Sequence, residues 1–169
     1  VGVPASVGTD AAGNNNAVAT DFTFAYDTTA PTVTITSGDV STGGSHNGAT
    51  TMIFTFSEEM TGIADGDFTF TNCAAGTFSV ETANTVFHQI CTPSSNGATV
   101  TISVDASGGT DPAGNNNAAA TDFTFTYDTT RPTITTVAVA GATEDGYGVA
   151  STYVVTITPS ETLASAPTL

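Results

Sequence analysis

Oxygen-bearing side chains are gathered in a few short segments of this sequence, and they are the residues best suited to chemistry. Carboxylates and amides stand close together in SEEM, in ADGD, in DPAGNNN and in two DTT motifs that lead into a proline. Carboxylate and carbonyl oxygens are the ligands that Ca²⁺ prefers, about six to eight of them in a flexible arrangement. The candidate ligands for such an ion are Asp27, Glu58, Glu59, Asp65, Asp67, Asp111, Asn115, Asn117, Asp128 and Glu161.

The charge balance gives this calcium hypothesis a physical reason. The chain carries 16 carboxylates against one cation, Arg131, and has no lysine, for a formal net charge of −15. Carboxylates packed together without a cation repel one another. Asp, Asn and Gly are also frequent in turns, because their backbones tolerate left-handed geometry. A calcium site and a set of ordinary polar turns are therefore both open readings, and no segment matches an EF-hand loop.

Cys73 and Cys91 offer a second kind of chemistry. They are the only two cysteines, and a pair with no other thiol fits a disulfide in an oxidising compartment. Two free, partly buried thiols are the alternative. Structural zinc is disfavoured, since it needs four ligands and only His88 lies nearby. The cysteine pair therefore favours a disulfide and an extracellular location.

No pattern of residues indicates catalysis. His46 lies in the Gly-rich segment GGSHNG and His88 in an expected strand, and neither comes with a nucleophile elbow or a phosphate-binding loop. Glu58 and Glu59 are adjacent, so on extended backbone they point to opposite faces. The sequence predicts no enzyme. The missing basic clusters also exclude nucleic acid and anionic membrane surfaces as partners, and no apolar run is long enough to span a membrane.

The elements that must position these residues are strands. Phe, Val and Ile alternate with Thr and Ser, which is typical of half-buried strands and favours folding over disorder. Seven strands are expected, and essentially no helix, which predicts an immunoglobulin-like β-sandwich. The strands are placed at about 32–36, 50–57, 67–72, 77–81, 85–91, 98–105 and 121–127. The expected inward residues are Met52, Phe54, Phe56, Phe68, Phe70, Phe78, Val80, Val100, Ile102, Val104, Phe123, Phe125 and Tyr127.

An internal repeat sets the domain organisation. Residues 8–32 return at 109–133 with 21 of 25 residues identical, at an offset of 101. We therefore expect tandem sandwiches: the C-terminal part of one unit at 1–30, a complete unit at 31–131, and the N-terminal part of a third at 132–169. The chain is expected to be a segment of a longer array of such units.

Tracing the strands up and down predicts which loops meet. The connections 57–67 and 105–122 should lie at the end where the linker carrying Asp27 enters, which would gather the candidate ligands at one domain junction. Asp128 and Glu161 should contribute in the same way to the following junction. Cys73 is expected at the end of the third strand and Cys91 at the end of the fifth, so the two cysteines should meet at the opposite end of the sandwich.

Three motifs carry a resemblance to a known family. They are FTFSEEMTGIADGDFTF at 54–70, TDPAGNNNAAATDFTFTYD at 110–128, and the linkers DTTAPT and DTTRPT at 27–32 and 128–133. Together they resemble the bacterial Ig-like domains found in tandem in very large surface proteins and adhesins. The resemblance implies calcium at the linkers, since related adhesin domains place it there. Such domains usually lack cysteine, so Cys73 and Cys91 depart from the pattern.

The expected function is an extracellular structural or adhesive array, a stalk, filament or adhesin shaft, stiffened by calcium. Its partners would be neighbouring repeats of the same chain and identical chains in a filament. A calcium-dependent carbohydrate-recognition module is an alternative, but the chain has no Trp and most Phe should face inward. A spacer in a secreted enzyme is another.

Overall fold

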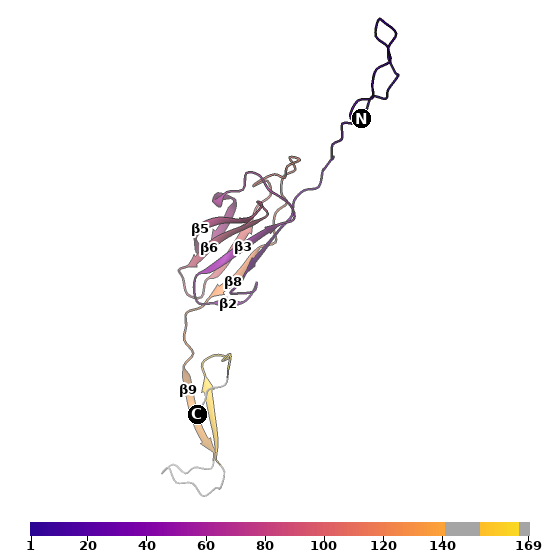
Figure 1. Cartoon of the computed structure of the whole chain (residues 1–169). Coiled ribbons are helices and arrows are strands. Elements are labelled where there is room, and N and C mark those ends of the chain that lie inside the picture. Colours follow the sequence, from indigo (N-terminus) through magenta and orange to yellow (C-terminus); the bar gives the residue numbers. More distant parts are fainter. Residues whose placement is uncertain (141–152, 166–169) are drawn as a thin grey trace.

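A computed structural model describes residues 1–140 and 153–165 of the chain. Its centre is a sandwich of two four-stranded sheets, with an N-terminal segment leaving one end and a two-stranded hairpin following the other (Figure 1). The elements are β1 (Val33–Ser37), β2 (Ser45–His46), β3 (Thr50–Phe56), the 3-10 turn η1 (Asp65–Asp67), β4 (Phe68–Thr71), β5 (Cys73–Thr82), β6 (Val86–Pro93), β7 (Thr99–Val104), β8 (Phe123–Tyr127), β9 (Ile134–Ala140) and β10 (Val154–Pro159).

The two sheets follow an immunoglobulin-like order. One is β1-β3-β6-β5 and the other is β2-β8-β7-β4. Every pairing is antiparallel except that of β2 with β8. The predicted all-β sandwich is confirmed, and all seven expected strands are present within a few residues. We call the end where residues 27–31 enter the proximal end, and the end where residues 128–132 leave the distal end.

The core lies between the sheets and is built by the alternation seen in the sequence. β3 alternates between buried positions and exposed or half-buried ones, with Met52 and Phe54 completely buried. The rings of Phe54 and Phe68 stack across the sandwich with centroids 3.9 Å apart. Thr and Ser occupy most outward positions, where a β-branched polar side chain suits a half-exposed strand. Burial of these aromatic and aliphatic side chains is the main stabilising term.

Several expectations are corrected by the structure. Val80 faces inward opposite Phe87 but remains 47 % exposed, because β5 is the edge strand of its sheet and no strand covers that position. β5 begins at Cys73 and not at 77, since Asn72 adopts a positive φ of 60° and turns the chain directly from β4 into β5. The short β2 and the turn η1 were not expected, and Phe87 is an additional core residue.

The structure forms the Cys73–Cys91 disulfide, with Cα atoms 5.6 Å apart. Cys73 is the first residue of β5, not the end of the preceding strand as expected, and Cys91 lies in β6 two residues before its end. The two strands are neighbours, and Cys73 lies diagonal to Cys91 in their register. Because Cys91 also pairs with Thr50 at the start of β3, the bond lies at the distal end, as expected.

The hairpin β9–β10 repeats the pairing of β1 with β3. Ser160 donates its backbone N–H to Thr133 O at 2.7 Å and accepts the N–H of Thr133 at its hydroxyl, as Ser57 does with Thr32. The apolar residues of this hairpin are largely exposed. The expected third unit also includes 141–152 and 166–169, which lie outside the described residues.

Gln89 is the least expected member of the core. Its side chain is 2 % exposed, and its Nε2 reaches Gly76 O only at 3.5 Å. Its Oε1 is buried and has no hydrogen-bond partner among the described residues. An unsatisfied buried carbonyl is destabilising by about 1–3 kcal/mol.

We therefore predict that Gln89→Met stabilises the domain by about 1 kcal/mol, because methionine has a similar length and leaves no polar atom unpaired. Urea unfolding followed by circular dichroism measures the change. Gln89→Glu is the matched control of the same shape, and it should destabilise by placing a carboxylate in the core. A Gln89→Met protein less stable than the wild type would contradict the assignment.

The disulfide gives a second prediction. It closes a sequence separation of 18 residues, so opening it should destabilise the domain by about 2–4 kcal/mol through the entropy of the unfolded chain. Denaturant unfolding of the oxidised and the reduced wild-type protein measures the change in the free energy of unfolding. The double variant Cys73→Ala/Cys91→Ala serves as a form in which the bond cannot re-form. Equal midpoints for oxidised and reduced protein would show that the bond adds nothing.

Candidate metal centre

Two long connections meet at the proximal end of the sandwich, as the strand trace predicts. Thr61, in the connection from β3 to β4, forms a two-way backbone bridge with Thr110, in the connection from β7 to β8, at 2.6 and 3.0 Å. Gly109 makes this approach possible, since a Cβ there would lie 2.8 Å from Thr61 O and 2.7 Å from Ile63 Cδ1. The bridge brings the acidic segments of both connections to one place.

The connection from β7 to β8 is held by the buried amide of Asn117. Its side chain accepts the N–H of Gly109 at 3.0 Å and donates to Asp105 O and Ala118 O at 2.9 and 3.0 Å. Asn117 is 2 % exposed, so each of these bonds replaces water that the amide has lost. Asn117 is among the predicted metal ligands; in the structure its amide holds backbone groups of its own connection.

The same connection holds the incoming linker. Asn115 Nδ2 donates to Asp27 O at 3.2 Å, and the N–H of Ala118 donates to Pro31 O at 2.8 Å. Pro31 itself is fully buried. Asp27 and Pro31 thus enter the domain at a fixed position. This linker clamp, residues 115–118 against 27–31, was not expected from the sequence, where Asn115 was read only as a ligand.

The clamp places three carboxylates together. Asp27, Glu58 and Asp111 each offer an oxygen, and these oxygens all lie within 4.8 Å of one another. We call these three residues the acidic cluster. Two oxygens bound to one Ca²⁺ at about 2.3–2.6 Å cannot be more than about 5 Å apart. The spacing of the acidic cluster therefore suits a shared calcium ion.

The electrostatics of the acidic cluster are unbalanced. Desolvation raises the pKa of Glu58, and the negative charges of Asp111 and Asp27 raise it further. Burial acts to raise the pKa of Asp111, but hydrogen bonds from the Asn115 side chain and from backbone N–H groups outweigh it, so this pKa lies below its usual value. The charged form of Asp111 is thus favoured, and the repulsion disfavours the charged form of Glu58. A cation bound between them would relieve it.

The other expected ligands lie outside the acidic cluster. Glu59 and Asp65 are exposed, and Asp67 uses Oδ2 to accept the N–H of Ala64 at 2.8 Å. Among the described residues, only Asp27, Glu58 and Asp111 form a group of three ligand atoms. Turn chemistry accounts for Asp67, as the alternative reading of these segments allowed.

Asp128 and Glu161 belong to the distal end. Asp128 accepts the N–H of Thr130 at Oδ1, 2.9 Å away, just as Asp27 accepts that of Thr29. Glu161 is exposed and follows β10. The two linkers therefore begin with the same local turn, while among the described residues neither Asp128 nor Glu161 belongs to a group of three clustered ligand atoms.

The loop of the metal centre occurs a second time in the N-terminal segment. Asp10 accepts the N–H of Asn14 at 2.9 Å and its side-chain amide at 3.0 Å, as Asp111 does with Asn115 at 2.8 and 2.8 Å. Asn16 accepts the N–H of Gly8 and donates to Pro4 O and Ala17 O, which repeats every bond of Asn117. The copy is exposed and has no sandwich beneath it. The same local sequence thus forms the same hydrogen bonds in both places.

Little else in the described chain suggests chemistry. His88 pairs with Glu81 at 2.7 Å on the surface, and His46 lies edge-on to Phe125. The large hydrophobic residues exposed in the sandwich itself are Val80 and Ile90, so its described surface lacks the aromatic platform of a sugar-binding site. The described residues include no helix with the length and apolar character needed to cross a membrane.

Comparison with known proteins agrees with the architecture. A family model described as bacterial Ig-like domain matches residues 27–127, which begins at the linker aspartate of the acidic cluster. Neither the curated proteins nor the solved structures give a match.

The two copies of the loop provide a prediction with an internal control. Asn117→Ala should destabilise the sandwich by about 3 kcal/mol, because it leaves buried backbone groups unpaired. Asn16→Ala removes the same bonds from the exposed copy and should leave the melting temperature of the sandwich unchanged. Differential scanning calorimetry of both variants measures this. Similar melting temperatures for the two would mean that Asn117 is not a structural anchor.

Proposed function

The chain belongs to the bacterial Ig-like domain family, whose members are typically non-catalytic and commonly extracellular, and we propose that it serves as part of an extracellular structural array. In this proposal the sandwiches follow one another as a stalk, filament or adhesin shaft. The chain has no enzymatic role. Its direct partners are the neighbouring repeats.

The repetition at an offset of 101 residues carries this proposal. The repeat extends from sequence to structure, because the loop at 4–17 has the same hydrogen bonds as the loop at 105–118. β9–β10 likewise repeats the serine-anchored pairing of β1 with β3. Stacked units with short linkers are the sequence signature of quasi-one-dimensional proteins, in which each unit contacts its neighbours.

The disulfide supports the extracellular location. A bond between Cys73 and Cys91 persists in oxidising compartments and is rare in reducing ones. It also fits a domain that must keep its fold outside the cell. A spacer in a secreted enzyme shares these properties, and the repeated linker favours the array over it.

We further propose that calcium stiffens the proximal junction. Asp27 stands on the linker and Glu58 and Asp111 on the domain, so an ion held by all three would join linker to domain. The residues fit the group: three carboxylates of suitable spacing, with the remaining positions of about six to eight filled by water or backbone oxygens. Calcium would supply the positive charge that this part of the chain lacks. The linker clamp orients Asp27 before the ion binds.

The prediction is that calcium raises the melting temperature of the 169-residue chain above its value in a chelator. Binding to the folded state alone stabilises by about 2.7 kcal/mol at a hundredfold excess over the dissociation constant. Glu58→Gln should weaken calcium binding in isothermal titration calorimetry. In chelator the same variant should melt higher than the wild type, because it removes the repulsion among the three carboxylates.

Glu59→Gln is the matched control, since Glu59 is adjacent, exposed and outside the acidic cluster. It should change neither the affinity nor the melting temperature. Small-angle scattering adds a functional readout: calcium should lengthen and straighten the chain, and Glu161→Gln should weaken the effect at the distal junction. If a chelator changes neither the melting temperature nor the length of the chain, the acidic cluster does not bind calcium and is only a solvated polar surface.

A further inference from the structure

The edges of the two sheets are protected to different degrees. Exposed edge strands invite pairing with another chain, and proteins blunt them with bulges, charges, proline or short length. β5 has two register irregularities and carries Glu81, β4 has four residues, and β2 has two. β1, with the sequence VTITS, is regular, uncharged and free of proline. Among the described edges of the sandwich, β1 is the one without such a device.

The backbone groups along the outer side of β1 are available for pairing. Thr32 O accepts the N–H of Ser57 at 2.9 Å, so residue 32 and its alternate neighbours Thr34 and Thr36 direct their backbone groups toward β3. Val33, Ile35 and Ser37 therefore direct theirs away from β3. The described residues provide no backbone partner for this second set.

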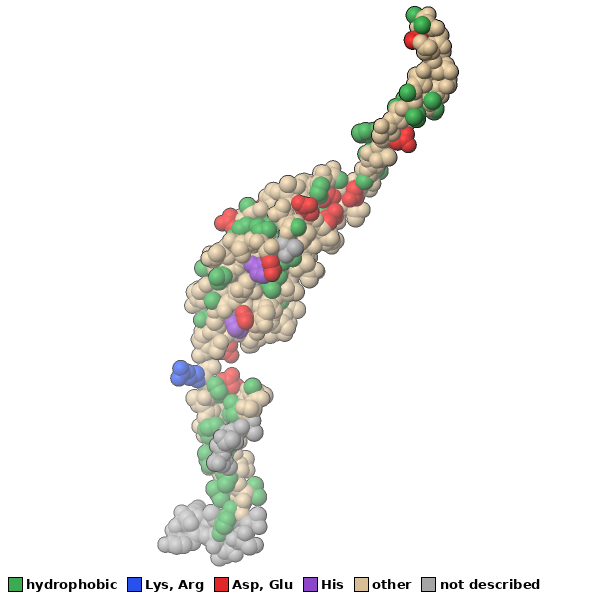
Figure 2. Space-filling view, viewed as in Figure 1, with side chains coloured by type: hydrophobic (Ala, Val, Ile, Leu, Met, Phe, Trp, Pro, Cys, Tyr) green, Lys and Arg blue, Asp and Glu red, His purple; other side chains and the backbone are tan. Residues whose placement is uncertain are grey.

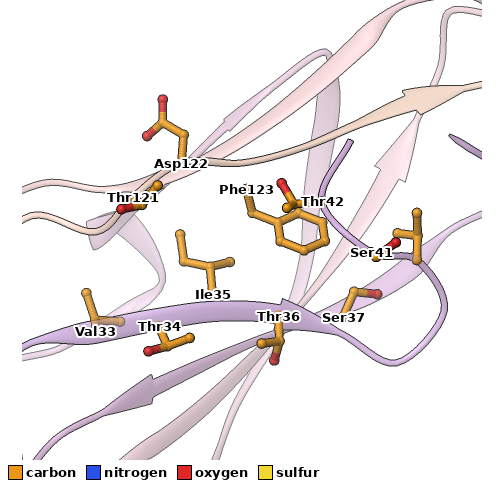
Figure 3. A pocket seen from close by; sticks show the side chains of 11 residues that line it. Val33, Thr34, Ile35, Thr36, Ser37, Ser41, Thr42, Thr121, Asp122 and Phe123 are labelled. Atoms are coloured by element: carbon orange, nitrogen blue, oxygen red, sulfur yellow. The ribbon is translucent and has the colours of Figure 1, made fainter. Parts of the chain in front are cut away.

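The space beside β1 is open. A groove of about 480 Å³ runs along all five residues of the strand and is closed on its far side by residues 40–42 and 121–123. Figure 3 shows Val33 and Ile35 pointing across this groove toward Phe123, while Thr34 and Thr36 point to the opposite side. The chain crosses close to β1 at the proximal end, where Ala118 bonds to Pro31. The middle of the strand borders the groove.

We propose that β1 pairs antiparallel with β1 of a second copy of this chain, which joins two four-stranded sheets into one of eight. A two-fold axis at Ile35 would place Val33 opposite Ser37 and Thr34 opposite Thr36. This surface is self-complementary, as an isologous interface requires. Each copy supplies the same donors and acceptors that the other leaves unpaired.

The distribution of charge favours antiparallel over parallel pairing of the two β1 strands. The acidic cluster lies at the proximal end. Arg131, the one Lys or Arg of the chain and hence the blue side chain in Figure 2, lies at the distal end. Parallel pairing would bring two acidic clusters side by side. Antiparallel pairing separates them and sets beside each acidic cluster the distal end of the other copy, where Arg131 partly offsets the charges of Asp39 and Asp128. β1 itself has no charged side chain, while Asp39 follows it and Asp122 borders the groove. The antiparallel direction, which keeps the two acidic clusters apart, therefore carries the lower repulsion.

Sedimentation velocity of the 169-residue chain from micromolar to millimolar concentration tests the proposal. The measurements are made in chelator, so that the outcome does not depend on the calcium hypothesis. We expect a concentration-dependent dimer. Amide exchange followed by NMR should show Val33, Ile35 and Ser37 becoming protected on dimerisation, while Thr34 and Thr36 are protected throughout.

Charge substitutions on the exposed threonines test the register. Thr34→Lys/Thr36→Lys places like charges opposite each other twice in the dimer and should weaken association about tenfold. Thr34→Glu/Thr36→Glu should do the same, and an equimolar mixture of the two variants should restore association. Thr51→Lys/Thr55→Lys, on the outward face of the neighbouring strand β3, carries the same change in charge and should dimerise like the wild type.

A chain that stays monomeric at millimolar concentration overturns the proposal, and so does a dimer in which the amides of residues 33, 35 and 37 exchange as freely as in the monomer. Edge variants that associate as well as the wild type would also overturn it. A failure of the two charged variants to restore each other would exclude the antiparallel register.

Discussion

The buried amide of Asn117 is the interaction on which the proximal end of the domain depends. The connection from β7 to β8 is long, and its backbone groups have no strand beside them. The Asn117 side chain bonds Gly109 and Asp105 in the first half of that connection, and its backbone bonds Ser107 and Gly109. These bonds satisfy buried polar groups that no regular strand pairs. The fold of this connection in turn sets the positions of Asp111, Asn115 and the incoming linker.

The acidic cluster shows how neighbouring carboxylates come to differ. Asp111 is the more buried, yet hydrogen bonds from Asn115 favour its charged form and lower its pKa. Glu58 lacks such donors, and its pKa is raised by desolvation and by its two acidic neighbours. Hydrogen bonds therefore favour the charged form of Asp111. The repulsion among the three carboxylates contributes instead to the raised pKa of Glu58.

The fold could be predicted from the sequence because the alternation of apolar residues with threonine is nearly unbroken. The strand positions, most of the core and the meeting of the two connections follow from that pattern. The errors come from local features that the alternation does not reveal. The positive φ of Asn72 sends Cys73 into a new strand, and the edge position of β5 leaves Val80 exposed. Neither effect changes the periodicity, so the sequence carries no signal of them.

The candidate site was harder to predict, because the same residue types serve two purposes. Asp27, Glu58 and Asp111 come together, and their loops could be brought together from the strand order. Asn117 and Asp67 have the same chemistry but bond to nearby backbone. Distinguishing ligands from turn-formers needs the direction of each side chain, and the loop backbone determines that direction.

The exposed copy of the loop has a consequence for how such a chain folds. Its bonds join residues no more than about a dozen positions apart, and short loops close with a small loss of entropy. A chain of nearly identical repeats faces a particular hazard, since a strand can pair with its counterpart in the wrong unit. Contacts that form locally commit each unit to its own residues before distant strands meet. The glycine and asparagine motif therefore makes its side-chain contacts within one copy of the loop, both at 8–16 and at 109–117.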